Sequence, residues 1–176
     1  MRAPARLVPV FALALSSAAF AQGPPLPGPE HEVLKRDVGV WDSVIELSFP
    51  GMPPSTMTGV ETNTLVAGRW LVSEYRGEVM GQAFEGRGLT GWDPAKRAYV
   101  GVWVDSMGTS INQSESTFDA ATGTLTGWME MVDPSGSKSR ARTQETWPTT
   151  DTRLVRVFPP NGGTEPLMKI TSTRRK

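Results

Sequence analysis

Three acidic residues of this chain, Glu74, Asp105 and Glu115, could support acid–base chemistry if they met in the interior of the protein. A carboxyl group that is desolvated in an interior has a raised pKa, which suits it to proton transfer. Two observations count against this reading. Glu74 falls on the strand face predicted to look outward, and interior acids are more often neutralised by arginines. The arginines available for this are Arg76, Arg87, Arg140 and Arg142.

A second set of residues could bind a small molecule. Aromatic side chains and methionines provide adaptable apolar walls, and a few acids can orient a polar head group. We predict that a ligand cavity is lined by Tyr75, Phe84, Trp103, Asp105, Glu115, Met129 and Met131. The same aromatic and methionine side chains could instead fill a solid core. The glycines on the same strand faces fill no space, and they favour an open cavity.

The sequence offers little for nucleophilic or metal chemistry. It contains no cysteine, which excludes a thiol nucleophile and a Cys-ligated zinc site. The only histidine is His31, and there is no Gly-x-Ser-x-Gly nucleophile motif. The spacing of the acids matches no known metal-ligand pattern. We therefore predict no metal and no required cofactor.

Most of these candidates lie on one stretch, residues 68–107, which contains three strand-length runs. In Arg69–Glu78 a two-residue period separates an uncharged face, which includes Leu71 and Tyr75, from a charged face. The uncharged face is predicted to point inward. The next run alternates glycines with Phe84 and Trp92, which permits a bent strand or a close approach by another group. In Arg97–Ser106 both faces are largely apolar, so periodicity does not decide which one points inward.

The remaining chain continues the pattern of strands and turns. A short helix is predicted over Glu30–Val38, with acids in its first turn and Gly39 after its end. Turn sequences such as DAATG, DPSG and PPNGG separate the later strand runs. The strand-length runs before and after the central stretch are residues 39–49, 56–66, 109–118, 125–132, 139–147, 153–158 and 167–173. Short links between about ten strands predict an all-β fold, an up-and-down antiparallel barrel preceded by a short helix.

The N-terminus has the features of an export signal. Arg2 and Arg6 precede an apolar run, and Ala19–Phe20–Ala21 forms a small-x-small cleavage site, so residues 1–21 are predicted to be a secretory signal peptide. The run is too short to span a bilayer. Residues 22–29 (QGPPLPGP) are predicted to be a linker, and residues 30–176 a single domain. The expected location is the periplasm or the medium, and without a cysteine no lipid anchor is expected.

The charge balance restricts the partners. The chain has 18 basic and 18 acidic residues, and loss of the signal would leave 16 basic residues against 18 acidic ones. A slightly acidic protein is not suited to broad binding of phosphate backbones, so no nucleic-acid partner is expected. The partner that we predict is a small, partly apolar molecule, and the protein is expected to be a monomer or a weak dimer.

Three segments together resemble the domain of unknown function 1579 family of bacterial proteins. They are His31-x-x-Leu34 followed by Gly39-x-Trp41, GVETNTLVAGRWLVSEYRGEVMGQAFEGRG, and GWDPAKRAYVGVWVDSM. The resemblance implies a lipocalin-like, calycin-type β-barrel and little chemistry.

Gly39-x-Trp41 is also similar to the opening of lipocalins, in which the tryptophan packs beneath an arginine of the last strand. That resemblance implies that Arg174 or Arg175 covers Trp41, although Trp41 could also be an ordinary core residue. Some related bacterial barrels hold haem through one histidine, so His31 or Tyr75 could be an axial ligand. A histidine that caps or packs at the start of the helix is the commoner arrangement.

These observations predict an exported protein that binds or carries a small molecule. An enzyme that uses interior carboxylates is one alternative. A second alternative is an interaction module without a ligand.

Overall fold

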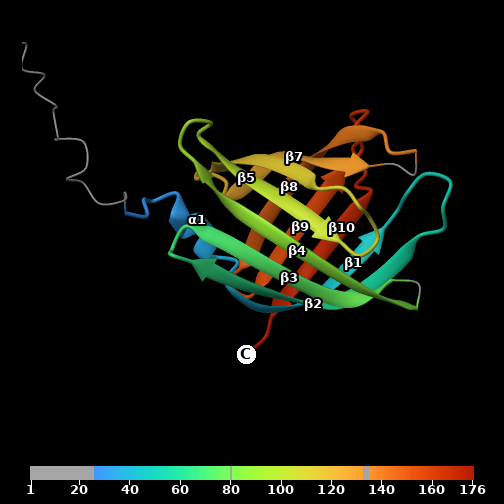
Figure 1. Cartoon of the computed structure of the whole chain (residues 1–176), viewed down its shortest axis with the longest axis horizontal. Helices are drawn as coiled ribbons and strands as arrows, with labels where there is room; N and C mark the ends of the chain where they lie inside the picture. Colours follow the sequence, from blue (N-terminus) through green and yellow to red (C-terminus); the bar gives the residue numbers. More distant parts are fainter. Residues whose placement is uncertain (1–25, 80, 133–134) are drawn as a thin grey trace, which may run out of the picture.

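The computed structural model describes residues 26–79, 81–132 and 135–176 (Figure 1). The predicted signal peptide and the first four residues of the predicted linker lie outside this range. The described residues form one helix, α1 (His31–Lys35), and ten strands. The strands are β1 (Gly39–Leu47), β2 (Ser55–Val66), β3 (Trp70–Val79), β4 (Gln82–Asp93), β5 (Ala98–Asp105), β6 (Asn112–Asp119), β7 (Thr124–Val132), β8 (Lys138–Thr149), β9 (Thr152–Phe158) and β10 (Met168–Arg174).

The strands close into a single antiparallel barrel in which each strand pairs with its neighbours in the chain. β1 completes the ring by pairing with β10, in a register that places Trp41 opposite Arg174 and Leu47 opposite Met168. Closure leaves no exposed sheet edge at which another chain could pair. The prediction of an all-β, up-and-down barrel of about ten strands is confirmed.

The helix is shorter than predicted. α1 ends at Lys35, and the backbone N–H groups of Arg36, Asp37 and Val38 each donate to the carbonyl three residues earlier. Such bonds tighten the last turn away from α-helical geometry. Gly39 follows with φ of +129°, and its positive φ turns the chain directly into β1.

The structure shows which faces of β3 and β5 point into the barrel. In β3 the uncharged face points inward as predicted, and both Leu71 and Tyr75 are buried. In β5 the side chains of Tyr99, Trp103 and Asp105 line the interior, whereas Val102 and Val104 are each 42% exposed on the outer surface. The register accounts for this choice, because Trp103 lies opposite Gly88 of β4, which leaves room for the indole ring.

The helix covers one end of the barrel, where it lies beside β3 and β4 (Figure 1). Val33 and Leu34 of α1 pack against Leu71 and Tyr99 in the main buried core. The Tyr99 hydroxyl donates to the Glu30 carbonyl at 2.8 Å and so fixes the start of the helix to β5. Among the described residues no helix is long and apolar enough to cross a membrane.

Candidate functional site

A cavity of about 520 Å³ lies inside the barrel. All ten strands and α1 contribute to its wall, and in most strands the lining residues alternate along the chain. Its volume lies within the range of about 300–1,000 Å³ that is usual for small-molecule sites. The solid core at the α1 end bounds it on one side.

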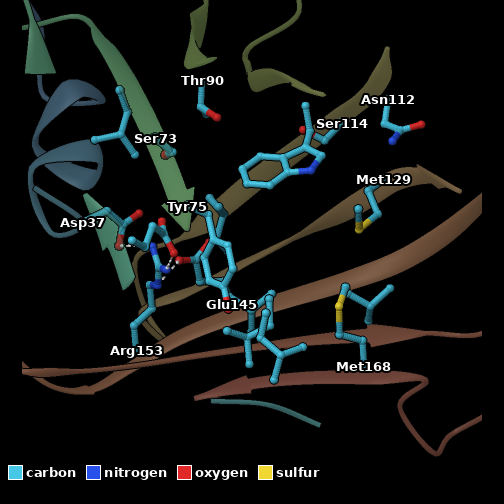
Figure 2. A pocket seen from close by; sticks show the side chains of 18 of the residues that line it. Asp37, Ser73, Tyr75, Thr90, Asn112, Ser114, Met129, Glu145, Arg153 and Met168 are labelled. Carbon is cyan, nitrogen blue, oxygen red and sulfur yellow. Dashed lines mark hydrogen bonds and ion pairs between the residues drawn. The ribbon is translucent and has the colours of Figure 1, made fainter. Parts of the chain in front are cut away.

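Six of the seven predicted ligand residues lie on this wall. They are Tyr75, Phe84, Trp103, Asp105, Met129 and Met131. The rings of Tyr75 and Phe84 meet edge to face with their centres 5.7 Å apart. Figure 2 shows Tyr75 in the middle of the cavity wall, with Met129 and Met168 on one side of it.

The glycines next to these aromatic rings leave room for the rings on the cavity wall. The Trp103 ring rests on Gly86 and Gly88, and a side chain added at Gly88 would bring its first carbon within 3.0 Å of the indole. The Tyr75 ring lies in the same way over Gly59 and Gly77. The glycines therefore let the large rings lie flat against the wall, which leaves the middle of the barrel open.

Asp105 is held in place at the end of the cavity remote from α1. Its carboxylate accepts hydrogen bonds from Trp103 Nε1 at 3.0 Å and from the backbone N–H of Met107 at 2.9 Å. The second bond also fixes the start of the β5–β6 loop. Asp105 therefore orients the indole of Trp103 on the cavity wall.

The prediction that Glu115 lines the cavity is wrong. Asn112 and Ser114 of β6 point inward, so strand alternation turns Glu115 outward, where Lys96 Nζ donates to its carboxylate at 2.8 Å. Glu74 also points outward, and it lies 3.6 Å from Arg87. Glu74, Asp105 and Glu115 therefore do not meet, and the catalytic arrangement predicted for them is wrong.

A different set of charges is buried at the α1 end of the cavity. Arg153 of β9 is surrounded by three carboxylates, those of Asp37 after α1, Glu61 of β2 and Glu145 of β8 (Figure 2). Arg153 Nη2 donates to Glu61, Nη1 lies 3.7 Å from Asp37, and Nε lies 3.8 Å from Glu145. All four side chains line the cavity. We call these four residues the Arg153 cluster.

Burial of the Arg153 cluster changes the protonation of its members. Desolvation raises the pKa of Glu145 to about 8, and the nearby charges of Asp37 and Glu61 add to the shift against the opposing effect of Arg153. Desolvation also raises the pKa of Asp37, although Arg153 and a hydrogen bond from Trp147 oppose it. For Arg153, desolvation is outweighed by the three carboxylates, which raise its pKa. At neutral pH Glu145 therefore carries a proton.

The Arg153 cluster was missed, although the sequence contains a weak signal for it. In β9, Arg153 begins the alternation that places Val155 and Val157 inside. Glu145 occupies the corresponding place between inward residues of β8, and Glu61 does so in β2. Each of these residues is the single charged residue on a strand face whose other residues are uncharged. That pattern could have identified them as interior charges.

The expected cover over Trp41 is provided by Arg174. Its guanidinium carbon lies 4.0 Å from the centre of the Trp41 ring, and its Nη2 donates to the Arg36 carbonyl at 2.7 Å. Arg175 instead pairs with Asp42 on the outer surface at 2.6 Å. A side chain at Gly39, which already has a φ of +129°, would also push against Arg174 Nη1.

The two side chains considered as haem ligands lie apart. His31 is at the start of α1, where its Nδ1 accepts a hydrogen bond from the Gly28 N–H at 3.0 Å, and it does not line the cavity. Tyr75 does line it. The structure therefore gives His31 a local role in fixing the start of the helix.

The closed barrel, its end helix and its interior cavity define a lipocalin-like β-barrel protein. The chain belongs to the family described as "Protein of unknown function (DUF1579)", which matches residues 26–174. No curated protein matches the chain.

Two solved structures have a similar fold. Rv2717c from M. tuberculosis is 10% identical, with a TM-score of 0.62 over 86% of this chain and 100% of that one. The S-type phycobiliprotein lyase CPES from Guillardia theta is 12% identical, with a TM-score of 0.54 over 84% of this chain and 93% of that one. At such identities the likeness shows the fold alone.

Proposed function

We propose that the protein binds one small molecule with a largely apolar body in the barrel cavity. The observation that carries the proposal is the cavity itself, which stays open although large aromatic side chains line it. The fold, which is shared with a phycobiliprotein lyase, is compatible with small-molecule binding. The apolar part of the ligand would contact Phe84, Trp103 and Met129.

A fluorescence titration tests this function. N-phenyl-1-naphthylamine is neutral and apolar, and its emission rises when it leaves water. We expect saturable binding with one site per chain, together with quenching of the protein's tryptophan emission, because Trp103 and Trp147 line the cavity.

A matched pair of variants on β4 locates the site. Thr90 lines the cavity and Leu89 is 40% exposed on the outer face of the same strand. Thr90→Phe should fill part of the cavity and weaken binding by about tenfold or more, whereas Leu89→Phe should bind as the wild type does. Equal binding by both variants would show that the probe binds elsewhere. If the wild type binds neither this probe nor any neutral, cationic or anionic dansyl probe, the proposal is refuted.

We also propose that the protein acts after export, in the periplasm or the medium. The features of residues 1–21 support this part of the proposal. The N-terminus of the protein purified from its own host should begin at or close to residue 22. An intact N-terminal Met1 in the purified protein would contradict export by cleavage of this signal.

A further inference from the structure

The Arg153 cluster carries more negative than positive charge inside the protein. Its three carboxylates face one guanidinium, and the exposed fractions of the four side chains are only 6% for Arg153, 10% for Asp37, 13% for Glu61 and 18% for Glu145. Isolated charge in a protein interior is costly, and it is usually paired or removed by protonation. In the empty protein a proton on Glu145 removes part of the excess.

Arg174, the next cation, does not neutralise the excess negative charge of the Arg153 cluster. This residue stacks on Trp41, donates to the carbonyls of Arg36 and Val38, and lies 3.5 Å from Asp151. Its charge lowers the pKa of Asp37 less than the charge of Arg153 does. The interior therefore has a place for one more positive charge.

Glu145 is the member of the Arg153 cluster that a ligand can reach. It has the largest exposed fraction of the three acids, and its strand neighbours Leu125 and Val155 line the cavity with it. Its contact with Arg153 is an ion pair at 3.8 Å without a hydrogen bond. Glu61 and Asp37, by contrast, are held by hydrogen bonds from Arg153 and Trp147.

A second polar group, the Tyr75 hydroxyl, also lacks a hydrogen-bond partner. Tyr75 lies opposite Glu61 in the β2–β3 register and is 4% exposed. This hydroxyl rests on Gly59 and Gly77 and has almost no surface open to the cavity, so the polar group of a ligand is assigned to Glu145 and not to Tyr75.

From this geometry we infer that the ligand is an organic cation, an apolar molecule with a protonated nitrogen that pairs with the Glu145 carboxylate. This inference rests on the proposed function and specifies its ligand class. As the cation binds, Glu145 releases its proton to solvent and the ammonium group takes over the neutralising role. Within the described residues no group of three or more His, Cys, Asp or Glu side chains could hold a metal ion, so an organic cation is the better occupant.

Three probes that differ only at one end test the inference. N-(5-aminopentyl)dansylamide carries an ammonium group, N-pentyldansylamide is neutral, and 6-(dansylamino)hexanoic acid carries a carboxylate. We expect the ammonium probe to bind at least about tenfold more tightly than the neutral probe near pH 8. The carboxylate probe should bind most weakly, because three acids surround the only guanidinium group of the Arg153 cluster.

A pair of isosteric variants assigns the effect to one residue. Glu145→Gln should weaken the ammonium probe by about tenfold or more and change the neutral probe by less than about twofold. Glu115→Gln removes the same charge from the outer surface and should change neither.

The pH dependence gives a readout that a loss of packing would not produce. Glu145 faces Asp37, Glu61 and Arg153, and it must lose its proton when the ammonium group binds. The affinity of the ammonium probe should therefore rise with pH, approaching about tenfold per unit between about pH 6 and 8, and level off above. The Glu145→Gln variant should show no such rise.

Failures of the two proposals can be distinguished. If the neutral or the carboxylate probe binds as tightly as the ammonium probe, the cation inference is overturned while the binding function stands. The same holds if N-phenyl-1-naphthylamine binds in the cavity and none of the three dansyl probes does. If no probe binds at all, both proposals fail.

Discussion

Replacing Glu145 by glutamine should stabilise the empty protein at neutral and alkaline pH. Glutamine has nearly the shape of a protonated glutamate but never becomes charged. In the wild type, burial raises the pKa of Glu145 from 4.5 to about 8, so the folded state holds a proton that the unfolded state releases. Stability from such a group is fully present below pH 4.5 and is lost as the pH rises to about 8.

The size of the effect follows from the same shift. Each unit of pKa difference corresponds to about 1.4 kcal/mol. The wild type should therefore lose about 3 kcal/mol of unfolding free energy between pH 4.5 and pH 7, and about 5 kcal/mol in total above pH 8. The Glu145→Gln variant lacks this loss. Asp37, whose pKa is also raised, titrates in both proteins, and its contribution largely cancels in the comparison.

Urea unfolding followed by tryptophan fluorescence from pH 5 to pH 9 measures this difference. The variant should be about as stable as the wild type near pH 5 and increasingly more stable toward pH 9. The control is Glu115→Gln, because that carboxylate is half-exposed and paired with Lys96. Parallel stability curves for wild type and Glu145→Gln across the whole range would show that Glu145 is ionised in the folded protein, which would refute the reasoning.

Two further predictions concern the barrel wall. Arg174→Met should lower the unfolding free energy by about 2–4 kcal/mol, because it removes the stacking on Trp41 and the hydrogen bonds to the helix carbonyls. The surface variant Arg175→Met should unfold like the wild type, and equal loss in both would contradict the assignment. Gly86→Ala should cost about 1–3 kcal/mol and shift the tryptophan emission, because the added methyl group displaces the Trp103 ring. Gly108→Ala is its control, since the nearest atom there is 3.9 Å away, and an unchanged emission in Gly86→Ala would contradict the packing.

The sequence alone was sufficient for most of the fold. Strand periodicity and turn residues are local properties, and they located all ten strands to within a few residues. The short links between strands also predicted the up-and-down order that the barrel has. Where the period was unambiguous, as in β3, the inward face was predicted as well. In β5 both faces are apolar, and only pairing with the glycines of β4 decided that Trp103 points inward.

The site could be predicted only in part, for a physical reason. Aromatic residues on a strand face already predicted to point inward reach the cavity, so residue type and strand periodicity together identified Tyr75. For Trp103 the residue type suggested a place on the cavity wall, and pairing with β4 decided it. Glu115 was misassigned because alternation in β6 is carried by polar residues on both faces, and only the register distinguishes them.

The Arg153 cluster depends on the tertiary structure altogether. Its members come from the turn after α1 and from β2, β8 and β9, and barrel closure alone brings them within 4 Å of the Arg153 guanidinium group. Local sequence determines which residues face the interior only where one strand face is plainly uncharged, as in β3. The closed barrel determines which of their charges meet, and burial there determines their protonation, because desolvation depends on everything that surrounds a group.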